Sequence, residues 1–182
     1  MTDHDLTDHD LAAVEAQLGR VPRGVVEIAH RCPCGLPDVV RTAPRLDDGT
    51  PFPTSYYLTC PRAASAVGTL EASGLMRRMT QRLSEDEDLA AAHRRAHQDY
   101  LARRAELGEV PEIAGVSAGG MPDRVKCLHV LLAHALAAGP GVTPLGDETL
   151  AALGAWWSDG PCVEVDPGLD LGVADRGVEV DR

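Results

Sequence analysis

Four of the chain's five cysteines occupy positions typical of metal ligands. Cys32 and Cys34 flank a proline in a Cys-Pro-Cys-Gly turn, Cys60 ends an apolar run, and Cys127 comes at the start of an apolar helical segment. A thiolate is a strong, soft ligand, and four thiolates in a tetrahedron bind zinc or an iron–sulfur cluster. We therefore predict one metal centre made by these four residues. Zinc is favoured because no ferredoxin-like cysteine spacing is present.

His134 is the additional ligand that we consider for this centre. It follows Cys127 by seven residues, which places both on one face of a helix, whereas His129 follows by two and is expected on another face. A cysteine is also a common small core residue, so a protein with no metal is the alternative. Cys162 has no role in this prediction.

The segment at 117–126, Ser-Ala-Gly-Gly-Met-Pro-Asp-Arg-Val-Lys, has the composition of an anion-binding helix start. Small residues let backbone amides approach an anion, and a helix N-terminus adds partial positive charge. We expect a helix from Asp123 onward and a small anionic ligand, a phosphate or a carboxylate. The residues expected to bind it are Ser117, Gly119, Gly120, Arg124 and Lys126.

A thiol-dependent enzyme is the alternative function for the same residues. A thiolate of low pKa at Cys127 or Cys34 would act as a nucleophile or a redox thiol on a small anionic substrate. The serine-hydrolase motif GxSxG and the metalloprotease motif HExxH are absent from the sequence. The sequence leaves open whether the chain is an enzyme.

An arginine-rich helical segment suggests a third function. Arg94, Arg95, Arg103 and Arg104 fall in the most strongly helical part of the chain. Their spacing predicts a solvated basic face that binds an acidic protein partner or another polyanion. On this interpretation the chain is a non-enzymatic regulatory or adaptor protein.

The elements that must position these residues indicate the α+β class. Thr7 followed by Asp10 predicts a capped helix over 8–18. Two β-branched runs, at 24–31 and 39–42, predict a hairpin with the cysteine pair in its loop, and the run at 55–59 predicts a third strand. The expected fold is a small, mostly antiparallel sheet from the N-terminal third, packed with several helices. The helices are expected from Pro61 to about Gly74, over 75–107 with a cap at Ser84, from Asp123, and from Asp147.

Length and composition define the setting. A chain of 182 residues with 44% hydrophobic residues supports a single core, so we expect one domain over 20–158, an N-terminal helix or arm at 1–19 and an acidic tail at 159–182. A net charge of −11 and 3% aromatic residues argue against nucleic-acid binding. An acidic N-terminus and the lack of a long apolar run predict a cytoplasmic protein with no membrane segment. The oligomeric state is left open.

Two long segments carry a family resemblance. They are RCPCGLPDVVRTAPRLDDGTPFPTSYYLTCP and SAGGMPDRVKCLHVLLAHALA. Together they resemble the bacterial domain-of-unknown-function family 501, over about residues 20–158. The resemblance implies a small cytoplasmic protein of a family with no established activity or cofactor. No catalytic residue follows from it.

Overall fold

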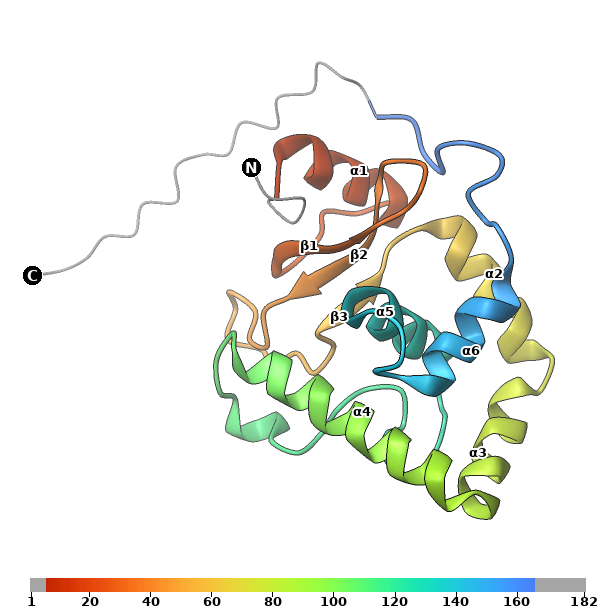
Figure 1. Cartoon of the computed structure of the whole chain (residues 1–182). Helices are drawn as coiled ribbons and strands as arrows, with labels where there is room; N and C mark the ends of the chain where they lie inside the picture. The colour runs from red at the N-terminus through yellow and green to blue at the C-terminus, as the bar shows by residue number, and fades with distance from the viewer. Residues whose placement is uncertain (1–5, 166–182) are drawn as a thin grey trace, which may run out of the picture.

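The computed structural model describes residues 6–165 as an α+β fold, which confirms the predicted class. Most of the tail predicted at 159–182 lies outside the described residues. Figure 1 shows the sheet and α1 in one half of the molecule and the remaining helices in the other. No helix in the described part of the chain is both long and apolar enough to cross a bilayer.

The sheet has three antiparallel strands in the order β1-β2-β3, so that β3 is an edge strand. The predicted hairpin around the cysteine turn is confirmed: Cys32 N–H donates to Leu36 O at 2.9 Å and Gly35 N–H donates to Cys32 O at 2.8 Å. The strand bounds are Val25–Arg31 for β1, Pro37–Thr42 for β2 and Tyr56–Leu58 for β3.

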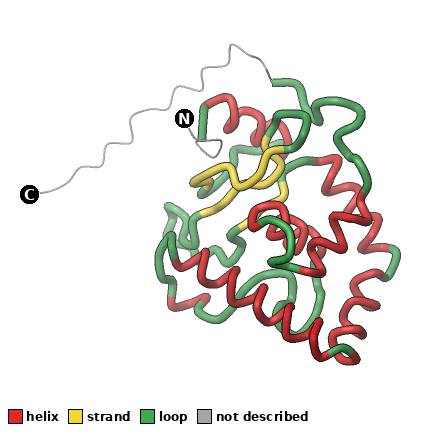
Figure 2. The backbone as a smooth tube through the Cα atoms, viewed as in Figure 1, coloured by secondary structure: helices red, strands yellow, loops and turns green. Residues whose placement is uncertain are grey.

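The two faces of the sheet are covered by different helices. Because side chains alternate along a strand, Val39 and Tyr56 enter the main core beside helix α5 (Leu128–Ala138), while Val40 packs with Val14 of helix α1 (Asp8–Leu18) on the other face. The sheet therefore separates a large core from a small one. Figure 2 shows the yellow strands between the N-terminal helix and the other helices.

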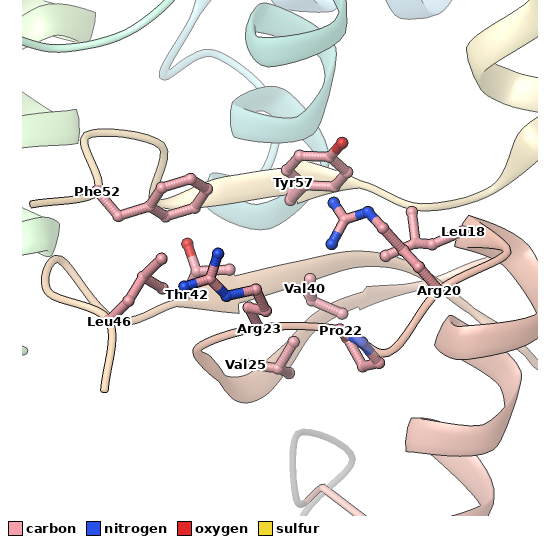
Figure 3. A pocket seen from close by; sticks show the side chains of 10 residues that line it. All are labelled: Leu18, Arg20, Pro22, Arg23, Val25, Val40, Thr42, Leu46, Phe52 and Tyr57. Atoms are coloured by element: carbon pink, nitrogen blue, oxygen red, sulfur yellow. The ribbon is translucent and has the colours of Figure 1, made fainter. Parts of the chain in front are cut away.

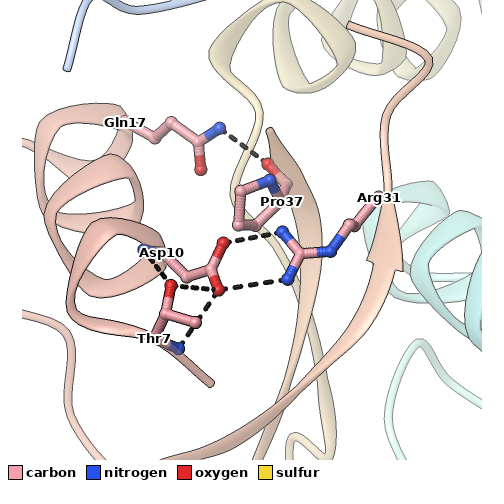
Figure 4. A network of polar contacts seen from close by, with 5 residues as sticks. All are labelled: Thr7, Asp10, Gln17, Arg31 and Pro37. Atoms are coloured by element: carbon pink, nitrogen blue, oxygen red, sulfur yellow. Dashed lines mark hydrogen bonds and ion pairs between the residues drawn. The ribbon is translucent and has the colours of Figure 1, made fainter. Parts of the chain in front are cut away.

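Helix α1 is fixed to the sheet by polar contacts as well as by Val14 (Figure 4). Thr7 and Asp10 form the predicted capping box. The same Asp10 carboxylate accepts two hydrogen bonds from Arg31 of β1, at 2.6 and 3.1 Å. At the far end of the helix, Gln17 Nε2 donates to Pro37 O at 2.7 Å. The helix cap is therefore also the attachment of α1 to β1.

Helix α5 lies at the centre of the main core, between the sheet and the other helices (Figure 1). Gly146 of α6 is buried against it, and a Cβ added there would lie 2.3 Å from Leu131 O. The close approach of α6 to α5 therefore depends on this glycine. The surrounding helices are α2 (Pro61–Ala72), α3 (Leu75–Glu85), α4 (Glu87–Ala105) and α6 (Pro144–Leu153), with a short 3-10 turn at Pro111–Ile113.

Three predicted helix starts are wrong. Helix α6 begins at Pro144, three residues before the predicted Asp147, with the proline in its first turn. Helix α5 begins at Leu128, five residues after the predicted Asp123, because the chain before it folds back as a loop in which Lys126 N–H donates to Gly119 O at 2.7 Å. The break between α3 and α4 is confirmed, but the cap of α4 is Asp86, which accepts from Leu89 N–H at 2.9 Å, and not Ser84.

Candidate functional site

The five cysteines lie in three places. Cys32 and Cys34 share the β1–β2 turn, the Cys60 thiol interacts with that of Cys162, and Cys127 interacts with His129. Within the described residues, no three of the ligands predicted from the sequence come together as a metal-binding group. The four predicted cysteines therefore do not meet in one group, because the β1–β2 turn, the start of α2 and the start of α5 give them different neighbours.

One group of potential ligands does come together, and it consists of Glu71, Cys127 and His129. One carboxylate oxygen, the sulfur and one ring nitrogen lie within 4.8 Å of one another, and all three residues are partly buried. Glu71 comes from the last turn of α2, Cys127 is the N-cap residue of α5, and His129 is in the first turn of α5. The junction of two helices therefore gathers a sulfur, a nitrogen and an oxygen donor.

Both ring nitrogens of His129 have partners. Nδ1 lies 3.2 Å from Glu71 Oε1, and Nε2 lies 3.1 Å from the Ala64 carbonyl oxygen of α2. The hydrogen bond with Cys127 and the neighbouring Glu71 carboxylate raise the pKa of His129 to about 9. In the metal-free protein the ring is therefore a cation at neutral pH, held between a thiol, a carboxylate and a carbonyl.

Glu71 has a second role at this junction. Its Oε1 also accepts a hydrogen bond from Leu128 N–H at 2.7 Å. Leu128 is the first residue of α5, and Cys127 makes no side-chain cap of its own. The free amide at the positive end of α5 is thus satisfied by a carboxylate from another helix.

Cys127 and His129 line a cavity of about 600 Å³. Its walls are formed by β3, the C-terminal end of α1, the start of α2 and the start of α5, and they are mainly apolar. The lining residues include Gln17, Tyr56, Tyr57, Pro61, Ala64 and Val130, and His129 is the one cationic side chain among all twelve. A small molecule in this cavity would meet the sulfur of Cys127 and the ring of His129.

The anion site predicted at 117–126 is not supported. Because α5 starts only at Leu128, its first amide lies outside the predicted segment and donates to Glu71. Gly120, at φ 92°, packs so closely that an added Cβ would lie 2.9 Å from Arg124 O. Ser117 Oγ contacts His97 Nδ1 at 2.8 Å, and Arg124 and Lys126 are exposed. The glycines allow a tight fold of the loop on itself.

His134, predicted as a spare metal ligand, is instead a core residue. Its side chain is fully buried, its Nε2 lies 2.8 Å from Asp99 Oδ2, and its ring stacks on that of Tyr56 with centroids 5.6 Å apart. Burial lowers the pKa of His134. It is therefore separate from the cluster at Cys127.

The four predicted face arginines have different environments. Arg94 and Arg95 are exposed, and an acidic partner at these two remains a prediction. Arg103 is partly buried and its Nε donates to Asp99 at 2.8 Å. Arg104 is buried and donates to three carbonyl oxygens, those of Pro53, Ile113 and Val116. Arg104 is thus part of the core and not of a solvated face.

A second, smaller cavity of about 220 Å³ lies over the sheet face that carries Val40. Figure 3 shows its lining side chains, which include the apolar Val25, Leu46 and Phe52 as well as Arg20 and Arg23. Arg23 pairs with Asp48. This cavity contains no cysteine or histidine, so it offers no metal or nucleophile chemistry.

Glu71 and His129 were not predicted as site residues. His129 was assigned to the wrong face because the helix was expected to start before Cys127. Glu71 is separated from His129 by 58 positions, and nothing local in the sequence marks it as a ligand. The position of Cys127 just before an apolar helical run was the one signal that pointed to this site.

The comparisons with known proteins identify a family. No curated protein and no solved structure matches the sequence. A family profile described as "Protein of unknown function (DUF501)" matches residues 28–151, more than half of the chain. Glu71, Cys127 and His129 fall inside the matched segment, as does the cysteine turn. The chain therefore belongs to the DUF501 family.

Proposed function

We propose that this protein binds a divalent transition metal, zinc in the first place, through Glu71, Cys127 and His129. The observation that carries the proposal is the gathering of one sulfur, one nitrogen and one oxygen donor within 4.8 Å of one another. This donor set suits zinc, which accepts thiolate, imidazole and carboxylate ligands. An iron–sulfur cluster is not supported, because such clusters are held mainly by several cysteines and this cluster has one.

The contacts of His129 support a metal ligand. Two ligand atoms of a tetrahedral zinc, each about 2.1 Å from the ion, are about 3.4 Å apart. The observed separation of 3.2 Å between His129 Nδ1 and Glu71 Oε1 is close to this value. The Ala64 carbonyl can accept a hydrogen bond from Nε2–H, which is the usual outer contact of a metal-bound histidine. The ring would thus present Nδ1 to the ion.

The number of protein ligands favours a reactive centre over a structural one. Structural zinc sites have four protein ligands, whereas catalytic sites have three and keep one position for water or substrate. Cys127 and His129 line the 600 Å³ cavity, so a small molecule there would have access to the ion. We therefore propose a metal centre that binds a small molecule.

Metal analysis of protein purified without a metal-binding tag tests the proposal. We expect about one zinc per chain, and we expect Cys127→Ser and His129→Gln each to lose it. Cys32→Ser and Cys162→Ser are matched controls that should keep the metal. Absence of zinc after incubation with zinc and desalting would refute the proposal, as would loss of zinc in Cys32→Ser with retention in Cys127→Ser.

A thiol nucleophile is the second candidate, and a specific contact favours it. The Cys127 sulfur lies within 4.8 Å of the His129 ring that Glu71 holds. A cationic imidazole beside a sulfur stabilises negative charge on it, which is one way in which cysteine nucleophiles are activated. In the protein treated with a chelator, iodoacetamide should then modify Cys127 faster than Cys162, and His129→Gln should slow this reaction. Equal rates at the two cysteines would exclude this candidate.

A further inference from the structure

A second thiol site lies in the β1–β2 turn, apart from the cluster at Cys127. Cys32 and Cys34 are two positions apart in a turn closed by the hydrogen bond from Gly35 N–H to Cys32 O, 2.8 Å long. Their thiols are close enough to influence each other electrostatically. A disulfide needs a Cα separation of roughly 4.4 to 6.8 Å, which residues two apart in a tight turn meet. The pair can therefore be joined without moving the strands.

The two thiols differ in exposure. Cys32 is 3% exposed, whereas Cys34 is partly accessible. Burial raises the pKa of Cys32 to about 12, and the neighbouring Asp38 carboxylate contributes in the same direction. Cys34 is therefore the thiol that an external molecule would meet, and Cys32 is a thiol that needs a base to lose its proton.

A buried carboxylate stands beside this pair. The Asp38 side chain is fully buried, and its Oδ1 lies 2.7 Å from His30 Nδ1. Its Oδ2 is also buried and has no hydrogen-bond partner, although a buried carboxylate oxygen normally has one. The His30 side chain is 32% exposed. The turn thus has near it a buried carboxylate with one unpartnered oxygen, and the other oxygen of this carboxylate contacts a partly exposed histidine.

We propose that Cys32 and Cys34 form a redox-active dithiol that reduces a disulfide substrate, with Asp38 as the base for Cys32 and His30 as the link to solvent. A redox pair fits these residues better than a second metal site, because they do not form a group of three close ligand atoms in the described part of the chain. This site is independent of the metal centre proposed above.

The reaction balances with a disulfide RS–SR as the oxidant. The Cys34 thiolate attacks one sulfur, which forms a Cys34–SR mixed disulfide and releases the first RS⁻. Asp38 takes the proton of Cys32, whose sulfur attacks Cys34 Sγ and releases the second RS⁻. The Cys32–Cys34 disulfide forms, two electrons pass to the substrate, and the two thiol protons end on the two released thiols.

Trapping of the mixed disulfide tests the order of these steps. Trypsin cleavage after Arg31 and Arg41 gives a peptide over 32–41 that contains Cys32 and Cys34 and no other cysteine. With bis(2-hydroxyethyl) disulfide, the wild-type peptide should lose two hydrogen atoms. Cys32→Ser should instead accumulate the mixed disulfide at Cys34, and Cys34→Ser should react at least about tenfold more slowly because Cys32 is buried.

Asp38→Asn tests the role of the carboxylate. The variant should form the mixed disulfide at the wild-type rate and then resolve it roughly 100-fold more slowly, since a positioned base contributes about this much. A merely structural role of Asp38 would not separate the two rates. Circular dichroism checks that the variant is folded. If it is unfolded, accumulation of the mixed disulfide in Cys32→Ser is the test of the dithiol mechanism.

Three results would overturn the proposal. The first is that Cys32→Ser forms no mixed disulfide. The second is that Cys32 and Cys34 react at equal rates. The third is that one bound zinc protects both thiols and is still bound in Cys127→Ser. The experiment is repeated in Cys127→Ser, where the dithiol should react unchanged. This comparison tells whether a negative result refutes the proposed metal centre or the proposed dithiol.

Discussion

Cys127 and His129 face the same cavity although only two positions separate them. Two residues of one helix at this spacing would point about 200° apart. This angle does not apply to Cys127, because it is the N-cap residue of α5 and has extended backbone angles of φ −152° and ψ 117°. The start of the helix therefore decides whether the thiol and the imidazole meet.

The raised pKa of His129 predicts a pH-dependent stability of the metal-free protein. Its folded pKa of about 9 lies above the ordinary value of 6.5. The stabilisation is therefore fully present below pH 6.5 and is lost as the pH rises through 9. We expect the difference in urea midpoint between the wild type and His129→Gln to shrink over this range. The exposed His9→Gln is the control, and a constant difference would contradict the prediction.

Zinc affinity should depend on pH over the same range. To bind the ion through Nδ1, His129 must give up a proton that it holds with a pKa of about 9. Cys127 must also bind as a thiolate, so each pH unit from 6.5 upward should strengthen binding by at least about tenfold until the pKa of His129 is reached. Competition with a chromophoric chelator measures this slope. Affinity that is independent of pH would argue against His129 as a ligand.

Two substitutions at Glu71 should distinguish the effect of its negative charge on His129 from its role as a hydrogen-bond acceptor at the start of α5. Glu71→Gln keeps an oxygen for Leu128 N–H but removes the charge that helps to raise the pKa of His129. Zinc content and the pKa of His129 should fall, and stability should decrease only at pH values where His129 is protonated. Glu71→Ala should in addition lose about 1 kcal/mol, as for other helix caps. The exposed Glu85→Ala is the control for stability. NMR titration of His129 and urea unfolding give the two readouts.

Arg104 and Arg94 should differ in their contributions to stability. Arg104→Ala removes a buried donor from three carbonyl oxygens, of which Pro53 O keeps Tyr100 O–H and Ile113 O keeps Val116 N–H. We expect a loss of about 1 to 3 kcal/mol. Arg94→Ala, in the same helix but exposed, should stay within about 0.5 kcal/mol. Similar losses in chemical denaturation would contradict the assignment of Arg104 to the core.

Gly146 and Gly68 form another matched pair. Alanine is the better helix former by about 1 kcal/mol, so Gly68→Ala, where an added Cβ meets nothing within 4 Å, should stabilise α2 by up to that amount. At Gly146 the Cβ would lie 2.3 Å from Leu131 O. Gly146→Ala should therefore cost about 1 to 3 kcal/mol. Thermal unfolding of both variants checks the opposite signs.

Local signals predicted much of the fold. Thr7 and Asp10 indicated the start of α1, because a capping box is defined by residue types within four consecutive positions. The β-branched runs around the cysteine turn indicated the hairpin. The start of α5 could not be predicted this way. Residues 123–127 are compatible with a helix, but in the structure they belong to a loop that folds back on Gly119 and Gly120.

The site was harder to predict than the fold because its residues meet through tertiary contacts. Cys127 was recognised by its type and place in the sequence. Its partner Glu71 comes from another helix, and the four cysteines that looked like one set belong to three neighbourhoods. Residue type indicated which chemistry was present, whereas the partners of each cysteine depended on the packing of distant elements.

Gln17 ties together segments from both sides of the family-matched region. Its Nε2 contacts Pro37 O at 2.7 Å and Cys162 Sγ at 3.3 Å. Both Gln17 and Cys162 lie outside residues 28–151, where the family profile matches. A protein trimmed to the family boundaries would lose α1, uncover Ile28 and Val40, and open one wall of the Cys127 cavity. The smallest unit worth expressing is therefore longer than the segment by which the family is recognised.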